Sequence, residues 1–177
     1  MKELTPLIDG DILQYETAFA VEARWRYVQE EQGFSTEEPA PSDWLAERIE
    51  EQMAYILNEI GTEKEPILFF TGKTNFRNDI ATTKKYKDRE GARPFHYNNA
   101  KAVLKNKWES FEREGLEADD LIAIWMTKYP DKSICVSRDK DLLQVEGWHY
   151  QWENNKQPSF GPLLVEGYGK IWVDKGT

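Results

Sequence analysis

The sequence is poor in the residues that form covalent cross-links, zinc sites and membrane spans. It holds a single cysteine, Cys135, and two histidines among 177 residues. One cysteine excludes an internal disulfide, as is typical of proteins from a reducing compartment, and so few His and Cys side chains disfavour a zinc site. No apolar run approaches the ~20 residues of a membrane span, and the N-terminus lacks the apolar core of a signal peptide. We therefore expect a cytoplasmic protein that makes no membrane contact.

Aromatic residues, by contrast, are frequent. They make up 13% of the chain, with seven tryptophans, and hydrophobic residues make up 40%. Disordered chains contain fewer aromatic residues than this. A length of 177 residues is enough for one domain with a sizeable core. The composition predicts a folded protein of about one domain.

The charge is unevenly distributed along the chain. The net charge of −9 as a whole argues against a nucleic-acid partner. Between positions 73 and 107, however, ten Lys and Arg residues stand against three acidic ones, a net charge of +7, so the remainder carries −16. A basic segment in an acidic protein is a candidate for anion binding. On charge alone, a solvated charged loop explains it equally well.

The hydrophobic pattern predicts an α/β fold with a largely parallel sheet, because apolar strands alternate with helical stretches. We expect strands at 4–13, 66–70, 133–136 and 148–152. We expect helices over about 14–32, 42–60, 98–114 and 117–128. In the last helix, Leu121, Ile124 and Trp125 are predicted to form the inner stripe. The region 154–177 contains Gly and Pro and is consistent with a hairpin rather than a further domain.

Seven carboxylates fall at the ends of these predicted elements: Asp9, Asp11, Glu117, Asp119, Asp120, Asp139 and Asp141. Asp9 and Asp11 are two residues apart at the end of a strand and so project to the same side. At the start of the helix over 117–128, Glu117 and Asp120 share a face and Asp119 points elsewhere. Sites in open α/β sheets form beyond the carboxyl ends of the strands, where the carboxylates near positions 9 and 139 fall.

Carboxylates that converge in this way repel one another unless cations neutralise them. Clusters of oxygen ligands suit Mg²⁺ or Mn²⁺ rather than Zn²⁺. Paired hard ions at such a cluster usually serve phosphoryl transfer, one activating water and the other stabilising the leaving oxygen. Each carboxylate alone also fits a simpler role, as a helix cap or as a turn residue. Together, the three groups of carboxylates and the basic segment favour a metal-dependent functional site.

Five segments in order resemble the 5′-nuclease superfamily: LIDGDIL, FFTGKTNFR, YKDREGARP, EADDLIA and SRDKDLLQ. This superfamily includes phage 5′→3′ exonucleases, the 5′-nuclease domain of bacterial DNA polymerase I and flap endonucleases. The match runs from Leu7 to Gln144 and is most similar to the phage branch. The most specific feature is EADD followed about twenty residues later by S-x-D-K-D-L, whereas DGD alone is a weak signal.

The resemblance implies a PIN-like three-layer α/β sandwich over residues 1–153, with a helical arch or gateway over about 73–107, and a C-terminal extension over 154–177. It implies two Mg²⁺ or Mn²⁺ ions on the seven carboxylates and hydrolysis of DNA phosphodiesters near single-stranded 5′ ends or flaps. Lys87 and Arg89 would contact the scissile phosphate as catalytic groups. Further contacts to the nucleic acid would come from Arg77, Lys84, Lys85, Tyr86 and Arg93. Tyr86 fits stacking on a terminal base and packing in the hinge of the arch equally well.

The sequence departs from the family pattern in two places. Gly72 stands where the family usually has an Asp. The motif G-D-x-x-D-N-I-P-G of the family's helix–three-turn–helix module, which supplies further ligands and grips duplex DNA, does not occur. We therefore expect weak activity from this chain, which is either truncated or completed by a separate chain.

Three alternatives to a DNA nuclease stay open. The first is a non-catalytic nucleic-acid-binding remnant, and the second is a PIN-type ribonuclease, because no residue reveals whether a 2′-hydroxyl is contacted. The third is an aspartyl-phosphate phosphatase, whose DGD-like motif usually continues with Thr or Val where this chain has Leu13. The third alternative is well behind, because that chemistry leaves the basic segment without a role.

Overall fold

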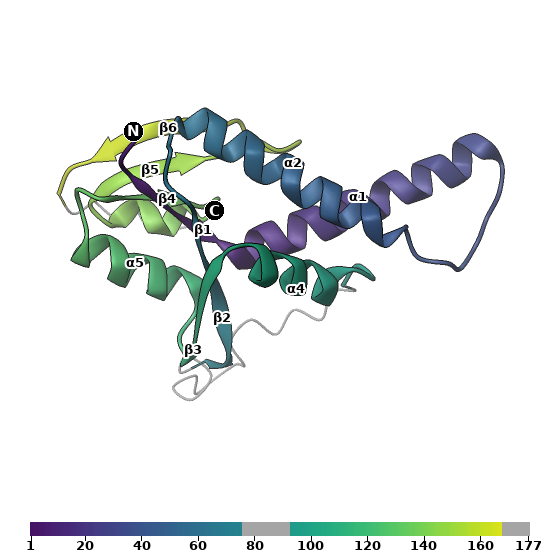
Figure 1. Ribbon diagram of the computed structural model, residues 1–177, viewed down its shortest axis with the longest axis horizontal. Helices are drawn as coiled ribbons and strands as arrows, with labels where there is room; N and C mark the ends of the chain where they lie inside the picture. Colours follow the sequence, from purple (N-terminus) through teal and green to yellow (C-terminus); the bar gives the residue numbers. More distant parts are fainter. Residues whose placement is uncertain (76–92, 168–177) are drawn as a thin grey trace, which may run out of the picture.

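A computed structural model describes residues 1–75 and 93–167 of the chain. A six-stranded sheet in the order β3-β2-β1-β4-β5-β6 forms its centre (Figure 1). The strands are β1 (Thr5–Asp9), β2 (Ile67–Asn75), β3 (Glu109–Gly115), β4 (Ser133–Val136), β5 (Gly147–Gln151) and β6 (Phe160–Val165). Neighbouring strands are parallel except β5 and β6, which are antiparallel. The predicted α/β fold with a mainly parallel sheet is confirmed.

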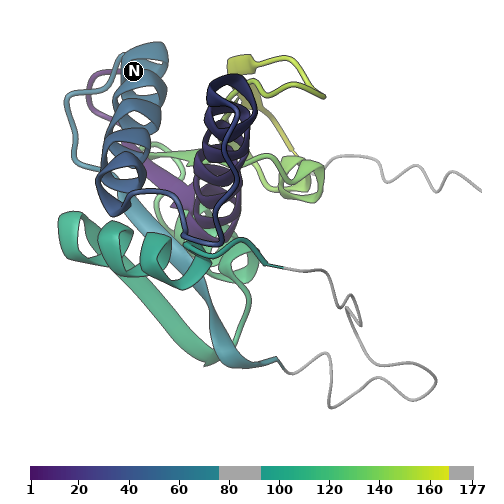
Figure 2. The same ribbon diagram turned by 90° about the vertical axis from the view of Figure 1, so that its right-hand side faces the viewer.

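Helices cover both faces of this sheet. They are α1 (Gly10–Gln32), α2 (Ser42–Ile60), α4 (Tyr97–Lys107) and α5 (Ala118–Lys128), with a short 3₁₀ helix, η1 (Lys140–Gln144). The helices α1, α2 and α4 share one hydrophobic core with the sheet, and α5 shares a second core with the other face (Figures 1 and 2). This is a three-layer sandwich, as expected. No helix within the described ranges is long and apolar enough to cross a membrane.

Successive residues of the inner strands point to opposite layers. In β1, Ile8 packs into the core with α1, α2 and α4, and Leu7 packs into the core with α5. In β2, Phe70 packs into the core with α1, α2 and α4, and Phe69 packs into the core with α5. Parallel strands covered on both faces need apolar side chains at every position, which explains the unbroken apolar runs of these segments.

The strand order reverses beside β1. The chain first builds β2 and β3 on one side of β1 and then returns to place β4 on its other side. In sheets of this kind, the crevice between the two halves opens beyond the carboxyl ends of the strands and commonly forms the ligand site. Asp9 ends β1 and Ser137 directly follows β4, so both residues lie at this crevice.

The first strand is shorter than the sequence pattern indicates. It was expected to continue to Leu13, but β1 ends at Asp9 and α1 begins at Gly10. The Asp9 carboxylate accepts a hydrogen bond from the backbone N–H of Ile12 (3.2 Å) and so caps the helix. Asp11 therefore lies in the first helical turn, and the expectation that Asp9 and Asp11 project together from a strand is wrong.

A second correction concerns the region after position 107. A helix was predicted over 98–114, but α4 ends at Lys107 and Glu109–Gly115 forms strand β3. Pairing with β2 decides this, with Phe111 stacked on Phe69 at 6.0 Å between ring centroids. The local Glu and Arg residues tolerate a helix, but the pairing with β2 overrides that preference.

A third correction concerns the inner face of α5. Ile124 was predicted to point inward, yet its side chain is 52% exposed. Ile122 is buried in its place, and Leu121 is buried as predicted. The direction in which α5 crosses the sheet selects the buried stripe, and a row of apolar residues on both sides of the helix does not reveal that direction.

Candidate metal centre

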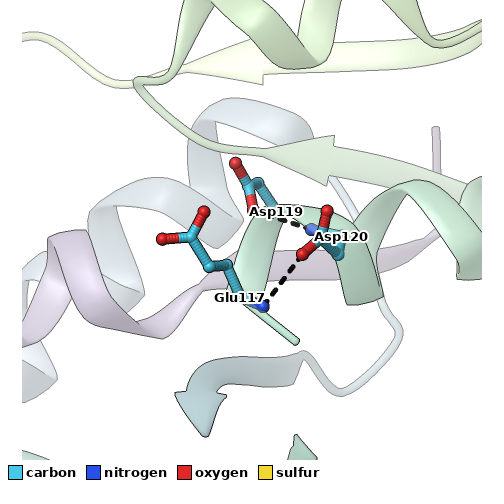
Figure 3. Close-up of side chains that lie close together, drawn as sticks. All are labelled: Glu117, Asp119 and Asp120. Atoms are coloured by element: carbon cyan, nitrogen blue, oxygen red, sulfur yellow. Dashed lines mark hydrogen bonds between the residues drawn. The ribbon is translucent and has the colours of Figure 1, made fainter. Parts of the chain in front are cut away.

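Three carboxylates meet at the N-terminus of α5 (Figure 3). Glu117, Asp119 and Asp120 each offer an oxygen that lies within 4.8 Å of the others. Asp120 Oδ2 accepts a hydrogen bond from the N–H of Glu117 (3.0 Å), and Asp119 Oδ1 accepts one from the N–H of Asp120 (2.8 Å). The expectation that Asp119 points away from the other two is wrong, because the start of the helix turns all three carboxylates to one place.

A serine links the ends of β1 and β4. Ser137 Oγ donates to Asp9 Oδ2 (3.1 Å) and accepts from the backbone N–H of Asp139 (3.0 Å). Asp139 Oδ1 in turn accepts from the N–H of Asp141 (2.9 Å) and caps η1. The carboxylates that follow the two strands are thus held in one hydrogen-bonded chain.

A threonine links the start of α1 to the start of α5. The backbone N–H of Thr71 donates to both Asp11 oxygens (3.2 and 3.1 Å), and the Thr71 hydroxyl also donates to Asp11. The same hydroxyl accepts from the N–H of Ala118 (3.1 Å), the first residue of α5. Asp11 is therefore positioned beside the residue that follows Glu117.

The electrostatics agree with this convergence. Burial, reinforced by the charge of Asp11 and more weakly by that of Asp119, raises the pKa of Asp9 to about 7. Hydrogen bonds from Ile12 and Ser137 to the Asp9 side chain favour its charged form. A cation at this position would relieve the repulsion and return the carboxyl to its ionised form.

The structure brings Glu117, Asp119 and Asp120 together, and Asp9 lies close enough to Asp11 and Asp119 for their charges to act on it. Asp119, Asp120 and Asp141 line one cavity of about 220 Å³. Burial raises the pKa of the Cys135 thiol, and the charges of Asp9 and Asp139 raise it further. Asp139 therefore lies near Cys135, as Asp9 does. This arrangement can bind and concentrate cations, with oxygen as its principal donor atom.

The donor set fits Mg²⁺ or Mn²⁺. The three oxygens at α5 lie within 4.8 Å of one another, whereas ligands of an octahedral Mg²⁺ site are about 3–4 Å apart, so modest side-chain rotation brings them together. Glu117 and Asp9 are 4% and 5% exposed. Burial penalises the charged form of a carboxylate, and a bound cation would offset that penalty.

Two residues of this site were missed from the sequence. Thr71 and Ser137 lie within the quoted segments FFTGKTNFR and SRDKDLLQ, but no role was assigned to them. A hydroxyl between two acidic motifs carries little signal by itself, because Ser and Thr are common in turns. Their positions directly after the apolar runs at 66–70 and 133–136 were the available hint.

The residues expected to contact nucleic acid are mostly not placed. Arg77, Lys84, Lys85, Tyr86, Lys87 and Arg89 lie outside the described residues, as does the stretch 76–92 of the arch predicted over 73–107. Arg93 is described, and its guanidinium lies over the ring of Tyr97 at 4.7 Å from the centroid. The charges of Arg93 and Asp11 both act on the Tyr97 hydroxyl, so these side chains lie in one neighbourhood.

The position of Gly72 explains the missing family carboxylate. The strand β2 extends to Asn75 rather than ending at Phe70 as predicted, so Gly72 lies within the strand, where its register with β3 shifts. A Cβ at position 72 would lie 2.2 Å from the carbonyl oxygen of Arg113 in β3. No side chain fits there unless the backbone moves, and Asp11 supplies the carboxylate next to Thr71 instead.

We expect Gly72→Ala to lower the free energy of unfolding by about 1–3 kcal/mol or more, because the added methyl overlaps backbone. Equilibrium unfolding in urea measures the change. Gly61→Ala is the matched control: Gly61 has φ +68° with no atom within 4 Å of an added Cβ, so only backbone strain, about 1 kcal/mol, is expected. Equal losses in the two variants would contradict the tight packing of Gly72 against β3.

Comparison with solved structures identifies the same fold in known nucleases. T5 D15 protein co-crystallised with metal ions matches with a TM-score of 0.54 and 15% identity over 84% of this chain and 55% of that chain. A mutant of T5 5′-exonuclease matches with a TM-score of 0.53 and 16% identity over 85% of this chain and 51% of that chain. T5 5′-exonuclease with bound zinc matches with a TM-score of 0.51 and 15% identity over 88% of this chain and 57% of that chain.

The chain thus spans about half the length of the solved nucleases it matches. No family model matches the sequence, and no curated protein matches it either. At this identity the likeness establishes the fold alone. The resemblance to 5′-nucleases, predicted from the motifs, is confirmed at that level.

Proposed function

We propose that this chain is a metal-dependent 5′-nuclease that hydrolyses DNA phosphodiesters near single-stranded 5′ ends or flaps. The observation that carries the proposal is the cluster of Glu117, Asp119 and Asp120, with Asp9 near Asp119, in a chain that has the fold of known 5′-nucleases. Two of these carboxylates, Asp9 and Glu117, are buried. A structural cap or a turn residue has no need of burial among like charges, whereas a metal ligand does.

Each group has a distinct role in this proposal. Glu117, Asp119 and Asp120 hold one Mg²⁺ or Mn²⁺ ion, and Asp9, Asp139 and Asp141 contribute to a second, with Asp11 at their edge. When bound, such ions supply water activation and stabilise the leaving oxygen. Ser137 and Thr71 keep the carboxylates in fixed orientations, as hydrogen-bond partners of metal ligands commonly do.

The phosphate would be held from outside this cluster. Lys87 and Arg89, with Arg77, Lys84, Lys85, Tyr86 and Arg93 around them, form the predicted arch, and their cationic side chains would position the scissile phosphate and stabilise its developing charge. The proposed catalytic domain covers residues 1–153, and the proposed extension over 154–177 adds β6 to the edge of its sheet. We expect this stretch of chain, which spans about half the length of the matched nucleases, to cut DNA weakly by itself.

Cleavage of labelled DNA tests the proposal directly. A 5′-labelled flap and a single-stranded oligonucleotide are incubated with the protein and Mg²⁺, Mn²⁺ or EDTA, and products are separated on a denaturing gel. We expect cleavage near the 5′ end with either ion and none in EDTA. The absence of metal-dependent products from both DNA substrates would overturn the proposal, and preferential cleavage of an RNA oligonucleotide would replace it with a PIN-type ribonuclease.

One observation favours a second candidate, a nucleic-acid-binding protein without cleavage. Gly72 leaves no room for the carboxylate that the family usually carries on β2, which removes one oxygen donor from the site. This candidate predicts that the protein binds DNA with equal affinity with and without Mg²⁺. It also predicts that binding is unchanged by Asp119→Asn and that no substrate is cut.

A further inference from the structure

A hollow of about 1010 Å³ runs along α1, on the opposite side from the cavity beside α5. The residues that line it come from α1, α2, the start of α4 and the Glu153–Lys156 segment between β5 and β6. In the view of Figure 2, α1 lies between α2 and this segment. Asp11, which belongs to the carboxylate site, also lines the hollow. Thr71 bonds both Asp11 and the first residue of α5, so one end of the hollow lies near the candidate metal centre.

Aromatic rings form much of its wall. Tyr15 and Phe19 lie one helical turn apart on α1 with ring centroids 4.4 Å apart, and Tyr15 is 51% exposed. Tyr55 of α2 and Tyr97 of α4 line it as well. The helix α1 thus carries apolar side chains on two faces, one against the sheet and one against this hollow. A solvated helix face has no structural need of such rings.

The polar groups of the hollow include hydrogen-bond donors that are not fully used. Arg48 Nη2 donates to Gln52 Oε1 (2.9 Å), but its buried Nε has no hydrogen-bond partner among the described residues. Lys156 is exposed at the rim. Glu16 is held by Arg138 Nε at 2.9 Å, which offsets its charge. Two cations, Arg48 and Lys156, then balance the remaining acids of the lining, Asp11 and Glu153.

We propose that this hollow binds a single-stranded segment of the DNA substrate, with bases against Phe19 and Tyr55 and phosphates at Arg48 and Lys156. Base stacking on aromatic rings with a few cations at the backbone is how proteins bind single strands without sequence preference. Because Asp11 lines the hollow, one end of the occupant would lie near the site that would cut it. The inference rests on the proposed function for the identity of the occupant but not on cleavage itself.

Binding is measured in EDTA, so that it is separate from catalysis, by fluorescence anisotropy of a labelled dT oligomer of about 12 nucleotides. We expect Tyr55→Leu to weaken binding about tenfold through loss of stacking. Lys156→Ala is expected to lower the magnitude of the slope of log affinity against log salt by about 0.7, the value of one phosphate contact on a single strand. Lys156 is exposed, so this variant is not expected to disturb folding.

Two variants outside the hollow serve as matched controls. Tyr27→Leu removes a 59% exposed ring from α1, the helix that carries Tyr15 and Phe19. Lys132→Ala removes an exposed cation just before the amino end of β4. Both are expected to bind like the unaltered protein. If Tyr55→Leu and Lys156→Ala bind no differently from these controls, the inference is overturned, even in a protein that cuts DNA.

Two further results decide the identity of the occupant. A protein that fails to cut DNA but shows the expected binding losses would keep the inference and overturn the proposed function. An rU oligomer of equal length that binds through the hollow more tightly than the dT oligomer would overturn the assignment to DNA.

Discussion

Replacing Asp119 with asparagine is expected to reduce metal-dependent cleavage about 100-fold or more. Asp119 is the carboxylate that connects the two parts of the site: its oxygen lies within 4.8 Å of those of Glu117 and Asp120, and its charge acts on Asp9. An amide keeps the shape of the side chain but removes the negative charge that attracts a divalent ion. Initial rates on the 5′-labelled flap at saturating Mg²⁺ measure the effect.

The control for this variant is Asp131→Asn. Asp131 is exposed and precedes the amino end of β4, whereas the carboxylate cluster lies beyond the carboxyl ends of the strands. Its replacement should therefore leave the rate unchanged. Adding Asp139→Asn to Asp119→Asn should lower the rate by a smaller factor than Asp139→Asn does in the unaltered protein, because the effects of groups that act as a unit are not additive. Undiminished cleavage by a purified, folded Asp119→Asn protein would place the catalytic centre elsewhere.

A second large effect is expected on stability. Without metal, the pKa of Asp9 is raised to about 7 by burial and by the charges of Asp11 and Asp119. Between about pH 4 and pH 7 the folded protein therefore keeps a proton that the unfolded chain releases. The free energy of unfolding should fall as pH rises through this window, by up to about 4 kcal/mol from this group.

Asp9→Asn removes this titration while keeping an acceptor for the N–H of Ile12. In EDTA, the variant and the unaltered protein should have similar stability near pH 4. At pH 8 the variant should be more stable by a few kcal/mol, because the buried charge is gone. Urea unfolding at several pH values gives the difference between the two proteins, in which the titration of the other carboxylates largely cancels.

Mg²⁺ provides the matching test. At pH 8, millimolar Mg²⁺ should raise the stability of the unaltered protein, since an ion that binds the folded state stabilises it by mass action. It should have much less effect on Asp9→Asn. A variant that is as unstable as the unaltered protein at pH 8, or that Mg²⁺ stabilises equally, would show that Asp9 does not carry the burial cost.

Some of the fold could be predicted because the relevant signal is local. In α2, five apolar residues recur at helical spacing, and all of them are buried: Leu45, Ile49, Met53, Ile56 and Ile60. The helix period is a property of the nearest few residues, so the pattern is visible without knowledge of the partner. The apolar run at 133–136 predicted β4 for a similar reason, because a strand buried on both faces needs an unbroken apolar segment.

Other elements depend on partners distant in the chain. The segment Glu109–Gly115 has a composition compatible with a helix, and it becomes a strand because the open edge of β2 accepts its backbone hydrogen bonds. Ile124 and Ile122 have similar side chains, and only the crossing of α5 over the sheet decides that Ile122 is buried. No local pattern contains this information.

By itself, the sequence determined the α/β class, the order of the acidic motifs and the hard oxygen chemistry of the candidate site. The tertiary structure alone decided how these groups meet. Asp9 and Ser137 are 128 residues apart, and Asp11 and Thr71 are 60 apart, yet each pair is hydrogen-bonded. The physical reason is that the register of the strands and the positions at which α1 and α5 begin set these distances. Residue spacing in the sequence indicates only on which side of a helix or strand a side chain lies.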